Sequence, residues 1–207
     1  KMYVSQNSEN TSLLDLTIVA NGKIAFPEDS FELLAFYTGG RCSPPISNVS
    51  FIEFNHSIDT SNVIDMSSMF MGINIEELEL SSFDTSKVIN MNGMFYFSKI
   101  VKIKGLNKFN TSKVINMRQM FGGIKTTTLD LSSFNTSKVT DMSRMFVASQ
   151  VEALDLSSFD ISSVTNMSNM FGDSEATTGY AKDADTAAKF NDSSITNIPD
   201  TLKFTVK

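Results

Sequence analysis

The sequence predicts an α/β repeat solenoid in which each coil contributes one short parallel strand and one short helix. One phrase recurs five times and ends at Phe70, Phe95, Phe121, Phe146 and Phe171, with spacings of 25, 26, 25 and 25 residues. A shorter alternating phrase precedes several copies, and neither end of the chain carries the period. A fixed period of this size is typical of stacked units that bury a shared core.

An alternating triplet predicts the strand of each coil. Leu78-Glu79-Leu80, Leu129-Asp130-Leu131 and Leu154-Asp155-Leu156 place an acidic residue between two leucines. Successive side chains of a strand point to opposite faces, so we expect leucines in the core and acids outside, in a leucine-rich-repeat-like arrangement. The third coil carries one extra residue within Ile103–Leu106, which predicts a bulge with Gly105 in an unusual backbone conformation.

The phrase that closes each coil predicts a short helix. In the fourth copy the apolar residues of Val139–Phe146 lie at offsets of 0, 3, 6 and 7, which places them on one helical face. Asp141 is a candidate N-cap, because its side-chain oxygen can accept from exposed amides. The Thr-Ser pair is an alternative cap, so the helix begins near Ser137 or near Asp141. We expect its methionines to pack in the core and to bind no metal.

The N-terminal part predicts a cap over the open end of the core. Leu16–Val19 and Lys23–Phe26 flank Asn21-Gly22, a dipeptide that favours the tight turn of a β-hairpin. Pro27 suits the first turn of a following helix, because proline lacks the amide that would be unpaired there.

The C-terminal part predicts a second cap. We expect a polar loop over Gly172–Gly179, a short helix over Asp183–Phe190, and a strand over Leu202–Val206 that pairs with the last repeat. The sequence therefore divides into an N-terminal cap (1–50), a five-coil solenoid (51–171) and a C-terminal capping segment (172–207).

Composition argues against several classes of function. The net charge is −6, and lysine and arginine are scattered along the chain without a basic cluster, so nucleic acid is not an expected partner. Cys42 and His56 are the single cysteine and the single histidine, which leaves no internal disulfide and little material for a nucleophile with a histidine base. The acidic residues that recur in register follow from strand alternation. We therefore predict no enzyme, no catalytic residue, no metal and no cofactor.

The repeat, as in LDLSSFDISSVTNMSNMF over residues 154–171, resembles the BspA-like leucine-rich repeats that were first collected as a Mycoplasma domain of unknown function. The resemblance covers about 120 residues. It implies a bacterial cell-surface protein or lipoprotein, with adhesion to host matrix proteins or to other cells as the proposed role. It carries over no catalytic residue.

We therefore predict an extracellular binding or adhesion module, with an architectural stalk of a larger surface protein as the alternative. The expected partner is a host matrix or cell-surface protein, and the protein is expected to be a monomer. No stretch approaches the roughly 18 apolar residues of a membrane span. Because the chain begins at Lys1, we expect that a targeting segment, if there was one, has been removed. The candidate partner-binding face is expected to favour a basic or cation-bridged partner. It comprises Glu53, Glu79, Lys102, Lys104, Asp130 and Asp155.

Overall fold

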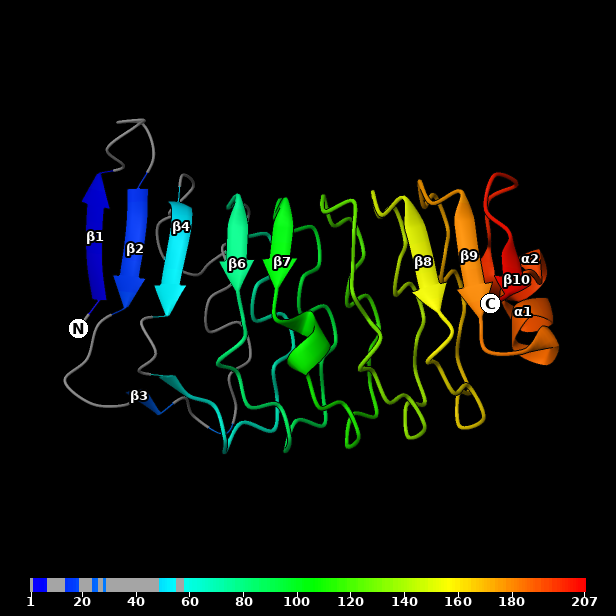
Figure 1. Ribbon diagram of the computed structural model, residues 1–207, viewed down its shortest axis with the longest axis horizontal. Helices are drawn as coiled ribbons and strands as arrows, with labels where there is room; N and C mark the ends of the chain where they lie inside the picture. Colours follow the sequence, from blue (N-terminus) through cyan, green and yellow to red (C-terminus); the bar gives the residue numbers. More distant parts are fainter. Residues whose placement is uncertain (1, 7–13, 19–23, 26–27, 29–48, 55–57) are drawn as a thin grey trace.

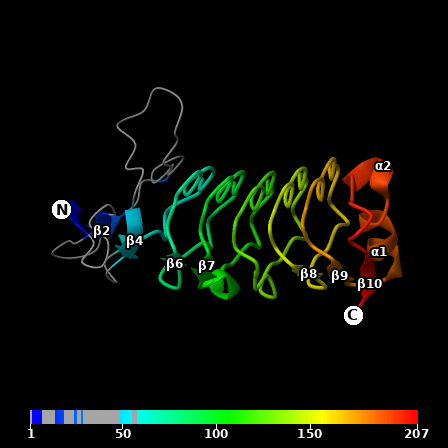
Figure 2. The same ribbon diagram turned by 90° about the horizontal axis from the view of Figure 1, so that it is seen from above.

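The computed structural model of the protein describes residues 2–6, 14–18, 24–25, 28, 49–54 and 58–207, with side chains for residue 28 and for 58–207 (Figure 1). The chain turns through successive coils that lie side by side along the long axis (Figure 2). The strands are β1 (Met2–Gln6), β2 (Leu14–Ile18), β3 (Ile24–Ala25), β4 (Val49–Phe54), β5 (Ile58–Asp59), β6 (Glu77–Glu79), β7 (Lys102–Lys104), β8 (Ala153–Leu156), β9 (Thr178–Ala181) and β10 (Phe204–Val206). The helices are η1 (Leu106–Lys108), α1 (Ala184–Phe190) and α2 (Ser193–Thr196).

Two sheets, one mixed and one parallel, follow one face of the coils. One sheet has the order β1-β2-β4-β6-β7 and the other has the order β10-β9-β8. Every strand pairing of the described residues is parallel, except that of β1 with β2. The predicted triplets at Leu78 and Leu154 overlap β6 and β8, but Leu129–Leu131 is not a strand. The gap lies in the coil that follows the one with the extra residue.

A second ladder joins the coils on another face. An Asp or Asn precedes the first methionine of each phrase, and these residues pair between neighbouring coils through isolated parallel bridges. After each of them, every second backbone amide donates a hydrogen bond to a backbone carbonyl of the next coil. In the fourth coil the Met142 amide donates to the Asn166 carbonyl at 2.9 Å, and the Phe146 amide donates to the Met170 carbonyl at 2.9 Å. The bridged residues are Asp65, Asn90, Asn116, Asp141 and Asn166.

These phrases form consecutive turns and not the predicted short helices. The Met145 amide donates to the Met142 carbonyl three residues back at 3.2 Å, and Arg144 between them has a left-handed φ of 57°. A left-handed residue cannot continue a right-handed helix. Asp141 still accepts from a nearby amide, that of Ser143 at 2.8 Å, but it closes an Asx turn and does not cap a helix. The equivalent left-handed residues are Ser68, Gly93, Gln119 and Asn169.

The apolar residues of the phrases fill the core. Met142, Met145 and Phe146 are fully buried, as predicted. Two columns of phenylalanine rings run along the long axis, and neighbouring rings within each column are nearly parallel. In the first column the centroids lie 5.6 to 6.0 Å apart. In the second they lie 6.4 to 6.5 Å apart. The first column comprises Phe70, Phe95, Phe121, Phe146 and Phe171, and the second comprises Phe109, Phe134 and Phe159.

The ends of the ladder are closed by segments that take the place of a coil. Within the repeats, the Ile89 amide donates to the Ile64 carbonyl at 2.8 Å. At the first coil the Ile64 amide donates instead to the Glu28 carbonyl at 2.9 Å. At the last coil the Asn169 and Phe171 amides donate to carbonyls of α2, those of Ile195 and Thr196. The amide donors of both terminal coils are therefore partly satisfied by carbonyls of non-repeat residues.

Sequence reasoning was partly right about the ends. Asp183 caps α1, which confirms the predicted C-terminal helix. The closing strand β10 pairs in parallel with β9 and not with the last repeat, because part of the segment predicted as a loop forms β9. The predicted hairpin is wrong, since β3 pairs in parallel with β5. The described residues do not include the predicted turn at Asn21-Gly22 or the predicted helix after Pro27 beyond residue 28. They also do not include Cys42 and His56.

Gly105 adopts the unusual conformation that the extra residue predicts. Its φ is 85°, and a Cβ there would lie against the backbone amide of Ser81 and 2.8 Å from the Leu80 carbonyl carbon. We expect Gly105→Ala to lower the free energy of unfolding by about 2–3 kcal/mol, because left-handed strain adds to a backbone overlap. Urea unfolding followed by circular dichroism measures this change.

Gly93→Ala is the matched control, because Gly93 also has a positive φ, of 60°, but a Cβ there would meet neighbouring atoms at an ordinary 3.5 Å. The equivalent position holds Ser68, Gln119, Arg144 and Asn169 in the same conformation. We expect a loss of about 1 kcal/mol from the backbone conformation alone. Equal losses for the two variants would show that the close approach at Gly105 has no energetic effect.

Candidate functional site

The predicted charged residues lie along the strand face. In β6 and β7, Glu77 is in register with Lys102 and Glu79 with Lys104, so these charges sit opposite one another across neighbouring strands. Asp155 belongs to β8, whereas Asp130 lies in the segment between the two sheets and is exposed. For Glu53 the structure places the backbone in β4, opposite Thr17 of β2, and its side chain lies outside the described residues.

The first group of charges is internally paired. Lys104 Nζ lies 2.5 Å from Glu77 Oε1, and Lys102 Nζ lies 3.8 Å from Glu77 Oε2. Hydrogen bonds from Ser81 are the largest cause that lowers the pKa of Glu79, and the Lys104 charge adds to them. All of these side chains are at least partly exposed, so the ion pairs contribute little to stability. Their main effect is to fix the pattern of charge on this face.

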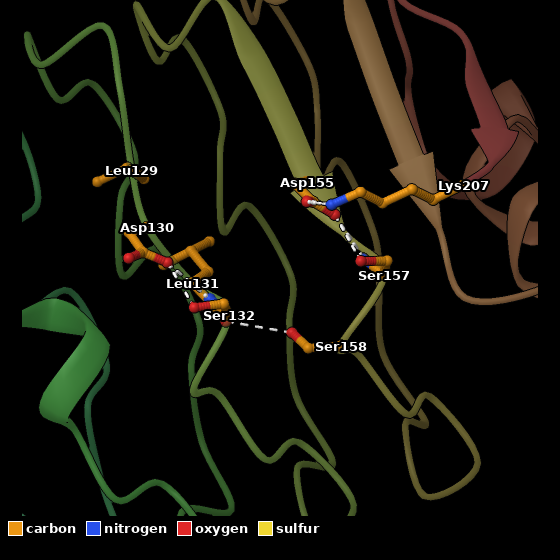
Figure 3. A pocket seen from close by; sticks show the side chains of 8 residues that line it. All are labelled: Leu129, Asp130, Leu131, Ser132, Asp155, Ser157, Ser158 and Lys207. Carbon is orange, nitrogen blue, oxygen red and sulfur yellow. Dashed lines mark hydrogen bonds and ion pairs between the residues drawn. The ribbon is translucent and has the colours of Figure 1, made fainter.

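The second group of charges borders a hollow of about 390 Å³ at the break between the two sheets (Figure 3). Lys207, one residue beyond β10, extends its ammonium group to the Asp155 carboxylate, where Nζ lies 2.5 Å from Oδ2. Among the described residues no ion pair includes Asp130. The residues that line the hollow are Leu129, Asp130, Leu131, Ser132, Asp155, Ser157, Ser158 and Lys207.

Local hydrogen bonds lower the pKa of both aspartates. The Ser132 hydroxyl donates to Asp130 Oδ1 at 2.6 Å and is the largest cause that lowers the Asp130 pKa, whereas the Asp155 charge acts in the opposite direction. Partial burial acts to raise the Asp155 pKa, but hydrogen bonds from Lys207 and Ser157 outweigh it and the pKa is lowered. The Lys207 pKa is raised by the same hydrogen bond. A carboxylate with a lowered pKa is a weak general base, so this arrangement suits ion pairing better than proton transfer.

Lys207 is not among the site residues predicted from the sequence. The pairing of β8 with β9 and of β9 with β10 brings Lys207 to the site. Asp155 is aligned with Tyr180 of β9, and Tyr180 is aligned with Thr205 of β10. Lys207 lies two residues beyond Thr205 and therefore on the same side of its strand. The alternation over Leu202–Val206 was the available signal, but β9 had to be recognised before the register could be derived.

The chain belongs to the family described as Mycoplasma protein of unknown function, DUF285, which matches residues 48–102 and 96–203. The matched residues include β6 and β7, the hollow and most of the C-terminal segment, but not Lys207. No curated protein and no solved structure matches the chain. In the part of the chain that the structure describes, no helix has the length and apolar character that crossing a membrane requires.

Proposed function

We propose that this DUF285 protein is a repeat solenoid of strands and turns that acts as an extracellular adhesion module. Its BspA-like leucine-rich repeats present the charged strand face to a host matrix or cell-surface protein. The observation that carries the proposal is the hollow between Asp130 and Asp155, which combines two ionised carboxylates with apolar walls from Leu129 and Leu131. Apolar surface with a few fixed polar groups is typical of binding sites.

The charges of this face favour a partner with basic side chains. Lys207 already places one ammonium group on Asp155, whereas Asp130 has no ion pair among the described residues. A lysine or arginine of a partner would find an ionised acceptor at Asp130, next to apolar surface for its aliphatic stem. Charge complementarity of this kind contributes mainly to specificity and to the rate of association.

The test measures binding of the protein to a panel of purified extracellular matrix proteins and to whole cells. For a partner found in this way, we expect the Asp130→Asn, Asp155→Asn double variant to bind about tenfold more weakly, which corresponds to about 1.4 kcal/mol. Raising the salt concentration should weaken binding of the parent, because exposed charges are screened within about 8–10 Å.

The matched control is an Asp185→Asn, Asp200→Asn double variant, which removes the same charge from exposed positions of the C-terminal segment. It should bind as the parent does. If both double variants lose affinity equally, net charge and not the hollow determines binding. A protein that binds nothing in the panel would favour the architectural stalk, which is the alternative function.

A further inference from the structure

The repeat period gathers three lysines that look scattered in the sequence. Lys87, Lys113 and Lys138 follow the Thr-Ser pair in three successive phrases, and all three side chains are exposed. Asn62 holds the same position in the first phrase, and Lys87 Nζ donates to Asn62 Oδ1 at 2.8 Å. Side chains at this position of neighbouring coils are therefore within reach of one another. We call Lys87, Lys113 and Lys138 the lysine row.

Adjacent turns hold the lysine row in register. The hydroxyl of Thr85 donates to the Asn110 carbonyl at 3.1 Å, and that of Thr111 donates to the Asn135 carbonyl at 3.0 Å. Both threonines lie two residues before a lysine of the row. Neighbouring parallel segments lie about 4.8 Å apart, so the row presents cationic groups at nearly even intervals along the long axis.

The charge of the lysine row is only weakly compensated. Asp84 lies close enough for the Lys87 charge to lower its pKa, although hydrogen bonds from Ser86 are the larger cause. Asn110 and Asn135 take the place of this aspartate in the next two coils, so Lys113 and Lys138 lack an equivalent carboxylate. None of the ion pairs found among residue 28 and residues 58–207 includes a lysine of the row. The like charges repel one another, and an anionic partner would relieve this repulsion.

An apolar strip runs beside the lysine row. Ile89 is 40% exposed and Ile115 is 45% exposed, two residues after Lys87 and Lys113 respectively. A buried valine separates each lysine from its isoleucine, which places both side chains on the outer side of the coil. The surface therefore offers aliphatic contact next to cationic groups.

We propose that the lysine row and its apolar strip bind a linear sulfated polysaccharide laid along the long axis of the protein. Sulfate groups on successive sugars meet successive lysines, and the apolar faces of the sugar rings pack on Ile89 and Ile115. Single-stranded nucleic acid binding relies on stacking of bases on aromatic side chains, and this surface has none. Its coil spacing of about 4.8 Å also differs from the phosphate spacing of about 3.4 Å along each strand of a duplex. The site is separate from the charged strand face of the proposed function.

The test measures binding of heparin, chemically desulfated heparin and a single-stranded DNA oligonucleotide by calorimetry. We expect the parent to bind heparin, and a Lys87→Gln, Lys113→Gln, Lys138→Gln variant to bind it at least about tenfold more weakly with a shallower dependence on salt. Desulfated heparin should bind neither protein. The single variant Lys113→Gln should give an intermediate loss, because two of the three cationic groups of the row remain.

The matched control replaces three exposed lysines outside the row, as Lys99→Gln, Lys125→Gln, Lys189→Gln. It lowers the net charge by the same amount and should keep heparin affinity within about twofold of the parent. Three results would overturn the proposal: no heparin binding by the parent, an equal loss in the control variant, or DNA binding of equal strength that depends on the same row.

Discussion

Replacing Phe146 with alanine should lower the free energy of unfolding by about 3–5 kcal/mol, in the range of large-to-small substitutions in protein cores. The Phe146 ring is fully buried and stacks between the rings of Phe121 and Phe171, with centroid distances of 5.7 and 6.0 Å. The substitution removes contacts on both sides at once. The neighbouring coils are held by inter-coil hydrogen bonds on either side of the cavity and have little freedom to close it.

Urea unfolding of the parent and of Phe146→Ala measures the effect, with Phe97→Ala as the control. Phe97 is also a phenylalanine near the end of its phrase, but 57% of its surface is exposed and its φ is 52°. We expect Phe97→Ala to change stability by less than about 1 kcal/mol. A similar small loss for Phe146→Ala would mean that the ring column does not hold the coils together.

Replacing Thr136 with valine should lower the free energy of unfolding by about 2–6 kcal/mol, although valine has nearly the same shape. The Thr136 hydroxyl donates to the Asp160 carbonyl at 2.8 Å and accepts from the Asp160 amide at 2.8 Å. Thr136 is fully buried and Asp160 is partly buried, so valine would leave the Asp160 amide and carbonyl facing an apolar side chain in place of their hydrogen-bond partner.

Thr136→Ser is the matched control, because it keeps the hydroxyl and removes only a methyl group. Its loss should be clearly smaller than that of valine in thermal or urea unfolding. If serine proved as harmful as valine, packing of the methyl group and not the pair of hydrogen bonds would explain the effect. Thr60, Thr85 and Thr111 make the same pair of bonds to the next coil.

The positions of buried residues could be predicted from the sequence, but the local backbone of the phrases could not. The spacing of Val139, Met142, Met145 and Phe146 fits one face of a helix, and it fits two consecutive turns equally well. What decides between them is the left-handed residue, and this position accepts serine, glutamine, arginine and asparagine as well as glycine. Only Gly93 gave a local signal of that conformation in the sequence.

The candidate site also has features that could be predicted from the sequence and features that could not. Alternation within each triplet was enough to place Glu79, Lys104 and Asp155 on the strand face, because strand period is a local property. The break at Leu129–Leu131 and the approach of Lys207 to Asp155 depend on the register between segments. The register that brings Lys207 to Asp155 is set by β9 and β10, which lie outside the repeats and leave no mark in the residues of the site itself.

At the two ends of the ladder, Glu28 and α2 supply the carbonyls that a further coil would supply, and this allows such proteins to change length during evolution. The Glu28 carbonyl stands where the carbonyl of an earlier coil would, and the carbonyls of α2 stand where those of a later coil would. Duplication or loss of one unit between Asp65 and Asn166 would leave both junctions of this ladder chemically unchanged, because along the ladder each coil offers its neighbour the same donors and acceptors. Gene segments of this period can therefore be copied or deleted in frame without a new terminus having to evolve.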